Sequence, residues 1–273
     1  MKTACNIPVL NEEATTCTLT IEAGDQGLSL LWFNDEQQAV KGLVVFNFEA
    51  QEKSSDQLSA LINSYSELIT KAPKLKLFIN HSNCLIVPAL YNKPEWHASF
   101  LELMYGEKEG MKIGADEMNS ENCAVIYYLP SDIQAYLKAK TDSGAEKHSN
   151  TTILNTYQEE DLLYCQVFYE SVKILLRKQG QLCILQEYRY SSPEDVAYHL
   201  LQTCASHDVK PESARLRLCG MIARDSHLYD QLYNYFLDIA FIDCPAEIEL
   251  QKELAALPPH FLTHLIVLAQ CES

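Results

Sequence analysis

The chain contains short groups of residues whose side chains could carry out catalysis. Asp225-Ser226-His227 brings together the three residue types of a serine-hydrolase triad. A triad is assembled in space from distant parts of a chain, whereas Asp or Ser directly before an apolar run of helical period is typical of a helix N-cap. We therefore predict that this group begins a helix and does not form a nucleophilic site.

Two pairs that include histidine have the residue types of nucleophilic or metal sites. His81 and Cys84 lie in a loop after a predicted strand, but no third group nearby would orient them, so we predict a structural or exposed role. His260 and His264 share a helix face at i and i+4, without the acid that accompanies such a pair in the HExxH motif. The sequence therefore indicates neither a catalytic residue nor a metal ligand.

Charge and composition argue against several classes of function. The 273 residues include 21 Lys and Arg against 37 Asp and Glu, a formal net charge of −16, which argues against a surface for nucleic acid or anionic membrane. The ten cysteines include no CxxC pair, as is usual for unpaired thiols in the reducing cytosol. The start of the chain has no apolar signal segment, and the apolar stretch 261–269 is too short to span a membrane. We expect a cytoplasmic protein without a membrane span.

The elements that would position these residues begin with a set of three strands. Residues 18–48 have the period-two hydrophobic alternation of consecutive strands joined by short turns. Ser54 has the capping pattern of a helix start, and 74–79 (KLKLFI) returns as a strand after Pro73. The predicted order is therefore β-β-β-α-β.

A second stretch of the chain repeats this order. Residues 162–190 again read as three strands, and Ser191-Ser192-Pro193 places a cap and a first-turn proline before a helix. The strand at 215–220 (RLRLCG) is similar to KLKLFI. We therefore predict an α/β protein with an internal duplication.

The duplication predicts two lobes. The first lobe is 1–150 and carries an inserted segment at 84–140, and the second is 151–273. The polar stretch 141–150 is the predicted crossing between them. The predicted elements outside the repeated plan include a loop at 106–122, a helix at 131–140, and terminal helices at 246–257 and 259–271.

Two lobes with this strand and helix order resemble the actin-like ATPase superfamily, whose lobes are ribonuclease-H-like and hold a nucleotide in the cleft between them. Its first phosphate motif is a strand ending in Asp-x-Gly before a hairpin turn, and the corresponding residues here are Glu22-Ala23-Gly24, followed by Asp25. In such a turn the glycine lets backbone N–H groups approach phosphate, and the carboxylate holds a hydrated Mg²⁺. The alternative is an ordinary glycine-rich β-turn.

The other two motifs of the superfamily are altered in this chain. Alignment of Val172 with Leu28 places Gln166 at the position of the acid and Phe168 at the position of the glycine in the second phosphate motif. Gln has no charge, and Phe would obstruct a close approach of the backbone to phosphate. The third motif, a Gly-Gly pair that packs against the adenine, retains only Gly220. The changes affect the nucleotide site and spare the scaffold.

Within the superfamily, the middle segment is similar to pilus-assembly and secretion actin-like proteins, because Ile86-Val87-Pro88-Ala89-Leu90 leads to a helix at 96–104. The whole chain resembles a bacterial family of unknown function with a degenerate actin-like fold. We predict a non-catalytic pseudo-ATPase without a cofactor, which docks a protein partner through 84–140 or through the cleft. One alternative is a plain structural subunit of an oligomer. The other is a switch or ATPase that binds ATP with Mg²⁺ through Glu22, Gly24, Asp25 and Gly220.

Overall fold

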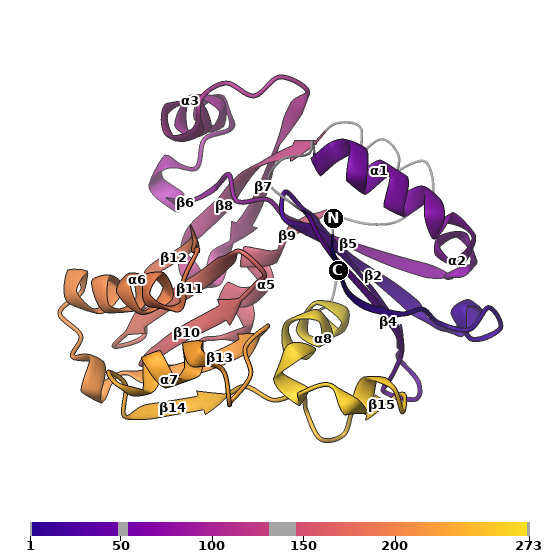
Figure 1. Ribbon diagram of the computed structural model, residues 1–273. Helices are drawn as coiled ribbons and strands as arrows, with labels where there is room; N and C mark the ends of the chain where they lie inside the picture. Colours follow the sequence, from indigo (N-terminus) through magenta and orange to yellow (C-terminus); the bar gives the residue numbers. More distant parts are fainter. Residues whose placement is uncertain (1, 49–53, 131–145, 272–273) are drawn as a thin grey trace. The chain divides into compact units, whose positions relative to one another are not determined.

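The computed structural model describes residues 2–48, 54–130 and 146–271, which form two compact units (Figure 1). The predicted helix at 131–140 lies outside the described residues, as do residues 141–145 of the predicted crossing. The first unit comprises Met1–Asn155, Ala246–Ala256 and Leu265–Ser273, and the second comprises Thr156–Pro245 and Leu257–His264.

The first unit is built on a seven-stranded sheet. Its strands are β1 (Lys2–Ile7), β2 (Thr18–Gly24), β3 (Gly27–Asn34), β4 (Ala39–Asn47), β5 (Lys74–Asn80), β9 (Lys147–His148) and β15 (Glu249–Leu250). They lie in the order β1-β4-β3-β2-β5-β9, and β15 pairs with β4. The helices α1 (Ser54–Ser64) and α2 (Ser66–Lys71) follow β4. The predicted order β-β-β-α-β is confirmed, with the helix divided in two.

The two faces of this sheet differ in chemistry, because successive residues of a strand point to opposite sides. On one face, the central strands β2, β3 and β5 carry apolar side chains, apart from Asn34 at the end of β3. The other face includes polar side chains that are also buried, namely Thr18, Thr20, Glu22, Ser29 and Lys76. Buried polar groups need partners, so this second face is where a site is expected.

A three-stranded antiparallel sheet forms another part of the first unit. Its strands β6 (Cys84–Pro88), β7 (Met111–Met118) and β8 (Cys123–Pro130) lie in the order β6-β8-β7. Helix α3 (Pro94–Tyr105) packs on one face of the sheet, where Leu101 joins Val87, Ile126 and Tyr128 in a small apolar core (Figure 1). The prediction of a loop at 106–122 was wrong because β7 is an edge strand with mostly polar or small residues, which leaves only a short and weak hydrophobic alternation.

The second unit contains a five-stranded sheet with the same strand order. Its strands are β10 (Leu162–Val167), β11 (Ser171–Lys178), β12 (Gln181–Arg189), β13 (Arg215–Gly220) and β14 (Asp238–Phe241). They lie in the order β12-β11-β10-β13-β14, which matches β4-β3-β2-β5-β9 in both order and direction. The helices α6 (Pro193–Ser206) and α7 (His227–Tyr233) contribute Val196, Leu200 and Leu232 to the apolar core.

The pairing register gives the hairpin of the second unit a direct counterpart in the first. Gln166 lies opposite Lys173, as Glu22 lies opposite Ser29, and each is the last pair but one before the turn. The alignment made from the sequence therefore agrees with the observed register. A common origin of the two units stays a prediction.

Part of the C-terminal segment belongs to the first unit. The prediction of a helix at 246–257 was wrong, because Glu249 donates its backbone N–H to the Gln38 carbonyl at 2.9 Å and β15 pairs with β4. This pairing overrides the local helix propensity of the segment. The turns η5 (Leu254–Ala256) and η6 (Pro259–Phe261) follow, and then the helix α8 (Thr263–Gln270). None of the helices in the described ranges has the length and hydrophobicity that a bilayer crossing requires.

The buried side chain of Lys76 holds the end of α8 within the first unit. Its ammonium group donates to the Ala269 carbonyl and, at 2.8 Å, to the Cys271 carbonyl. The last carbonyls of a helix lack partners inside the helix and carry a partial negative charge, so a cation here satisfies both requirements.

Candidate functional site

Gly24, one of the four site residues predicted from the sequence, is the last residue of β2. A Cβ atom at Gly24 would lie 2.0 Å from the carbonyl oxygen of Asn80, which is its register partner on β5. A side chain would therefore force the two strands apart. Packing of β2 against β5 is a sufficient reason for glycine at this position.

Asp25 and Glu22 lie on either side of this glycine and have different surroundings. Asp25 accepts hydrogen bonds from Ser82, at 3.1 Å from the backbone N–H and 2.5 Å from the hydroxyl, and so fastens the β2–β3 turn to the loop after β5. Burial lowers the pKa of the adjacent His81, and the Asp25 charge acts against that shift. Glu22 is buried on the polar face of β2.

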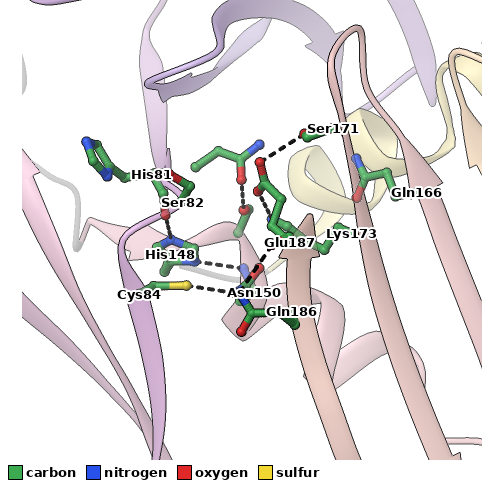
Figure 2. A network of polar contacts seen from close by, with 12 residues as sticks. His81, Ser82, Cys84, His148, Asn150, Gln166, Ser171, Lys173, Gln186 and Glu187 are labelled. Carbon is green, nitrogen blue, oxygen red and sulfur yellow. Dashed lines mark hydrogen bonds and ion pairs between the residues drawn. The ribbon is translucent and has the colours of Figure 1, made fainter. Parts of the chain in front are cut away.

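His148, which the sequence analysis did not single out, lies next to the same loop (Figure 2). Its Nε2 lies 3.0 Å from the His81 carbonyl oxygen, and its Nδ1 accepts the backbone N–H of Asn150 at 3.1 Å. Because Nδ1 accepts, the ring hydrogen is on Nε2 and is donated to His81. Both ring nitrogens bind backbone groups, so His148 positions the loop and is not placed to act as a general base.

A half-buried carboxylate supports His148 from the three-stranded sheet. Asp116 of β7 accepts hydrogen bonds from the His148 N–H and the Thr151 hydroxyl, both at 2.6 Å, and from the Tyr127 hydroxyl at 3.2 Å. Burial raises the pKa of Asp116, and these hydrogen bonds act against the shift. Asp116 therefore anchors the first turn of α5 (Ser149–Thr156) to the three-stranded sheet.

The sequence pair His81 and Cys84 has separate partners in the structure. The His81 Nδ1 accepts the Asn83 N–H at 3.3 Å. The Cys84 thiol accepts the Asn150 amide N–H at 3.1 Å (Figure 2). A nucleophilic pair requires a hydrogen bond between the base and the thiol. These contacts are consistent with the predicted structural role.

In the second unit, Gln166 belongs to a chain of buried polar side chains. The Tyr164 hydroxyl donates to the Gln166 amide oxygen at 3.1 Å, and the Cys219 thiol donates to that hydroxyl at 3.2 Å. Burial raises the pKa of Cys219 to about 12. All three side chains are neutral, so the position of the second phosphate-motif acid is part of an uncharged network.

The register partner of Gln166 is a buried cation. The Lys173 ammonium lies 3.9 Å from a carboxylate oxygen of Glu187, whose other oxygen accepts the Ser171 hydroxyl at 2.9 Å (Figure 2). Lys173 and Glu187 are themselves register partners on β11 and β12. The position next to Gln166 therefore carries a positive charge that is paired within the second unit.

Phe168 begins the β10–β11 turn and is held by contacts on several sides. Its N–H donates to the Ser171 carbonyl at 2.8 Å, and its own carbonyl accepts the Tyr190 hydroxyl at 2.9 Å. The Lys173 ammonium lies 5.6 Å from the centre of the ring, and His264 packs edge-on at 6.0 Å. The aromatic ring thus takes part in the packing of the turn.

Gly220 lies at the end of β13 in the second unit and has a φ of +86°. A Cβ atom there would lie 2.3 Å from the Val167 carbonyl oxygen, which also accepts the Met221 N–H at 2.8 Å. The left-handed conformation and the close strand contact both require glycine. As at Gly24, the packing of neighbouring strands explains the residue.

The remaining chemical groups predicted from the sequence have structural roles. The Ser226 hydroxyl accepts the Tyr229 N–H at 3.3 Å and caps α7, which confirms the N-cap prediction. His260 is buried and its Nε2 lies 2.6 Å from the Ile222 carbonyl. Within the described residues, no group of three or more His, Cys, Asp or Glu side chains is placed to hold a metal ion.

The described chain also presents an apolar surface around α3. Eleven large hydrophobic residues are exposed, and six of them lie between positions 90 and 113, which concentrates exposed apolar area in one segment. We call these six the α3 surface: Leu90, Tyr91, Trp96, Leu103, Met104 and Ile113. Concentrated exposed apolar area of this kind is typical of protein interaction sites.

Comparison with known proteins places these features in a family. A family model described as "Protein of unknown function (DUF3822)" matches residues 9–239. The chain belongs to this family. No curated protein matches the sequence of this DUF3822 member.

Two solved structures are similar to the DUF3822 member over nearly its whole length. One is a Bacteroides thetaiotaomicron protein with an actin-like ATPase fold and unknown function, at a TM-score of 0.76 and 14% identity, covering 97% of this chain and 99% of that one. The other is a PilM-PilN type IV pilus biogenesis complex, at a TM-score of 0.55 and 13% identity, covering 92% of this chain and 97% of that one. The DUF3822 member therefore has the actin-like ATPase fold that the resemblance implied.

The residues present do not fit the phosphate motifs that this fold implies for ATP with Mg²⁺. A hydrated Mg²⁺ is bound through carboxylates, but the second hairpin offers the amide of Gln166 beside the ammonium of Lys173. In the first hairpin both oxygens of Asp25 bind Ser82. Glu22 is the one residue of the predicted set whose charge matches the motif.

Proposed function

We propose that this DUF3822 member is a non-catalytic actin-like protein that docks a protein partner and uses no nucleotide. The observation that carries the proposal is the pair Gln166 and Lys173 in the second hairpin. A buried ammonium repels a divalent cation, and a neutral amide does not offset that repulsion. The pairing of Lys173 with Glu187 supplies the charge balance inside the second unit without a ligand.

The docking part of the proposal is supported by the α3 surface. Its most exposed residue, Leu103, has 82% of its surface accessible, which is unfavourable unless the surface is covered at some stage. The similar solved structure that contains PilM is, by its description, a complex with a second protein. A protein partner at the α3 surface is in keeping with both observations.

A titration with ATP and Mg²⁺ tests the absence of nucleotide binding. We expect no change in melting temperature at millimolar ATP·Mg²⁺, whereas a ligand present at about 100 times its Kd stabilises a protein by ~2.7 kcal/mol. Glu22 favours the alternative, an ATP-binding switch, because it retains the charge of the first motif. Stabilisation that disappears in Glu22→Ala but persists in a control variant at the exposed Glu12 would establish that alternative and contradict our proposal.

The docking part is tested with a matched pair of variants. Leu103→Glu introduces a charge on the α3 surface, and Leu237→Glu introduces the same charge at a similarly exposed position in the second unit. We expect cross-linking to a partner protein to disappear in Leu103→Glu and to persist in Leu237→Glu. A partner that is unaffected by Leu103→Glu would show that docking takes place elsewhere.

A further inference from the structure

The three-stranded sheet is wider than the single helix that covers it. Three strands at about 4.8 Å spacing and their side chains present a face about 14 Å across, while a helix covers about 10 Å. Helix α3 lies toward β6, because the Tyr105 hydroxyl at its end donates to the Cys84 carbonyl at 2.7 Å. The part of this face formed by the edge strand β7 is therefore left with less cover.

The apolar side chains of α3 are on the flank that lies on its β7 side. At about 100° per residue, Trp96, Phe100 and Leu103 share one flank, roughly opposite Tyr105. Since Tyr105 contacts β6 and the strand order is β6-β8-β7, this flank is on the β7 side of α3, and its residue Leu103 is turned away from the sheet and toward solvent. The spacing of i, i+4 and i+7 gives an apolar stripe, against which a second helix can pack.

The strand β7 supplies the second side of the same apolar area. Ile113 pairs with Tyr128, and Tyr128 belongs to the core beneath α3, so Ile113 lies on the side of the sheet that α3 covers. The Asn92 amide lies 3.4 Å from Glu117, and the Tyr128 hydroxyl donates to the Gly106 carbonyl at 3.2 Å. These contacts at the two ends show that α3 runs antiparallel to β7. The exposed apolar side chains Trp96, Leu103 and Ile113 therefore form an elongated area, which we call the strip.

The segment that contains the strip carries a net negative charge. Residues 88–121 include seven acidic and three basic side chains, a net charge of −4, and the whole chain carries −16. Of the seven acids, Asp116 is engaged by His148 and Thr151, while Glu95, Glu102, Glu107, Glu109 and Glu117 are exposed. An occupant with basic residues beside its apolar stripe is favoured over an acidic one.

We propose that the partner docks by a basic amphipathic helix that packs beside α3 and over β7, with its apolar stripe on Trp96, Leu103 and Ile113. This inference rests on the proposed docking function and specifies the kind of partner. The incoming helix would complete the cover of the three-stranded sheet, and its Lys and Arg residues would lie among the exposed glutamates.

The two tryptophans of the chain provide a direct measurement. Trp32 is fully buried and Trp96 is 38% exposed on the strip, so a change in emission on binding reports Trp96. The probes are three synthetic peptides: a leucine and lysine peptide of helical period, the same peptide with glutamate in place of lysine, and a scrambled leucine and lysine peptide. We expect a blue shift and saturable binding with the first peptide, and at least tenfold weaker binding with the other two.

Variants on the two sides of the strip then locate the binding. Leu103→Glu and Ile113→Glu should each weaken the first peptide at least tenfold, whereas Leu237→Glu, which changes the net charge equally, should leave its affinity within twofold. Three results would each overturn the inference. They are equal binding of the scrambled or glutamate peptide, unchanged binding of the first peptide to either strip variant, and no binding of any peptide. The ATP titration does not depend on peptide binding. If no peptide binds, the titration still shows whether the protein binds nucleotide.

Discussion

The carbonyl oxygen of Asn80 occupies the place where a side chain on Gly24 would begin, 2.0 Å from its ideal Cβ position. Gly24 is the glycine that makes the β2–β3 turn similar to a phosphate-binding motif, yet the neighbouring strand already requires it. A motif glycine that the strand packing explains is no longer a sign of ligand binding. The same argument applies to Gly220 and the Val167 carbonyl in the second unit.

We expect Gly24→Ala to destabilise the first unit by about 3 kcal/mol, because β2 and β5 must separate to admit the methyl group. Gly180→Ala is the matched control, since Gly180 has a φ of +72° but no atom within 4 Å of its Cβ position. The control should lose only about 1 kcal/mol, from conformational strain. Urea unfolding followed by circular dichroism compares the two, and an equal loss in both variants would contradict the packing explanation.

Lys76→Met should destabilise the first unit by about 2 kcal/mol, because the last carbonyls of α8 lose a charged hydrogen-bond donor. Lys74 is exposed on the same strand, so Lys74→Met should change the unfolding free energy by less than about 0.5 kcal/mol. The same urea experiment measures both. A negligible effect of Lys76→Met would mean that the end of α8 finds other donors.

The cap of α6 gives a prediction for pH dependence. The backbone N–H groups of Ser191 and Ser192 bind the Asp195 carboxylate and lower its pKa below the ordinary value of 3.8. A lowered pKa in the folded state means that this stabilisation is present above the ordinary pKa and is lost as pH falls through the lowered one. The melting temperature of Asp195→Asn should therefore lie below that of the natural protein at pH 7, and the difference should shrink toward pH 3.

The control for the pH experiment is Glu212→Gln, an exposed acid in the same unit. Its difference from the natural protein should stay small across the same pH range. If Asp195→Asn shows a difference that does not change with pH, the carboxylate charge is not what the cap uses.

Those parts of the fold with local sequence signals could be predicted. The strands around 18–48 and 162–190 alternate in hydrophobicity with period two, and Ser192 and Ser226 are caps that act within three residues of their own position. These signals depend only on neighbours along the chain. The predicted correspondence of Glu22 with Gln166 agrees with the register for the same reason, because each hairpin fixes its own pairing.

What could not be predicted depends on contacts between distant residues. The sequence around Glu249 has the composition of a helix, and its pairing with β4, through hydrogen bonds to the Gln38 and Val40 carbonyls, holds it extended. The partners of His148 come from His81, Asp116 and Asn150, and its polar neighbours gave no periodicity to recognise. The predicted set Glu22, Gly24 and Asp25 is contiguous in the first unit, while Gly220 lies in the second.

The return of the C-terminal segment to the first sheet has a consequence for synthesis on the ribosome. The strand β15 pairs with β4, and the Lys76 ammonium binds the end of α8, so the first unit uses residues that are translated after most of the second unit. Residues 156–245, which make up most of the second unit, emerge before that segment does. Until residues 246–271 have been translated, the first unit lacks the strand that pairs with β4 and the helix end that Lys76 binds. A nascent chain stalled after Pro245 should therefore be cut by protease within residues 1–155 faster than the released protein.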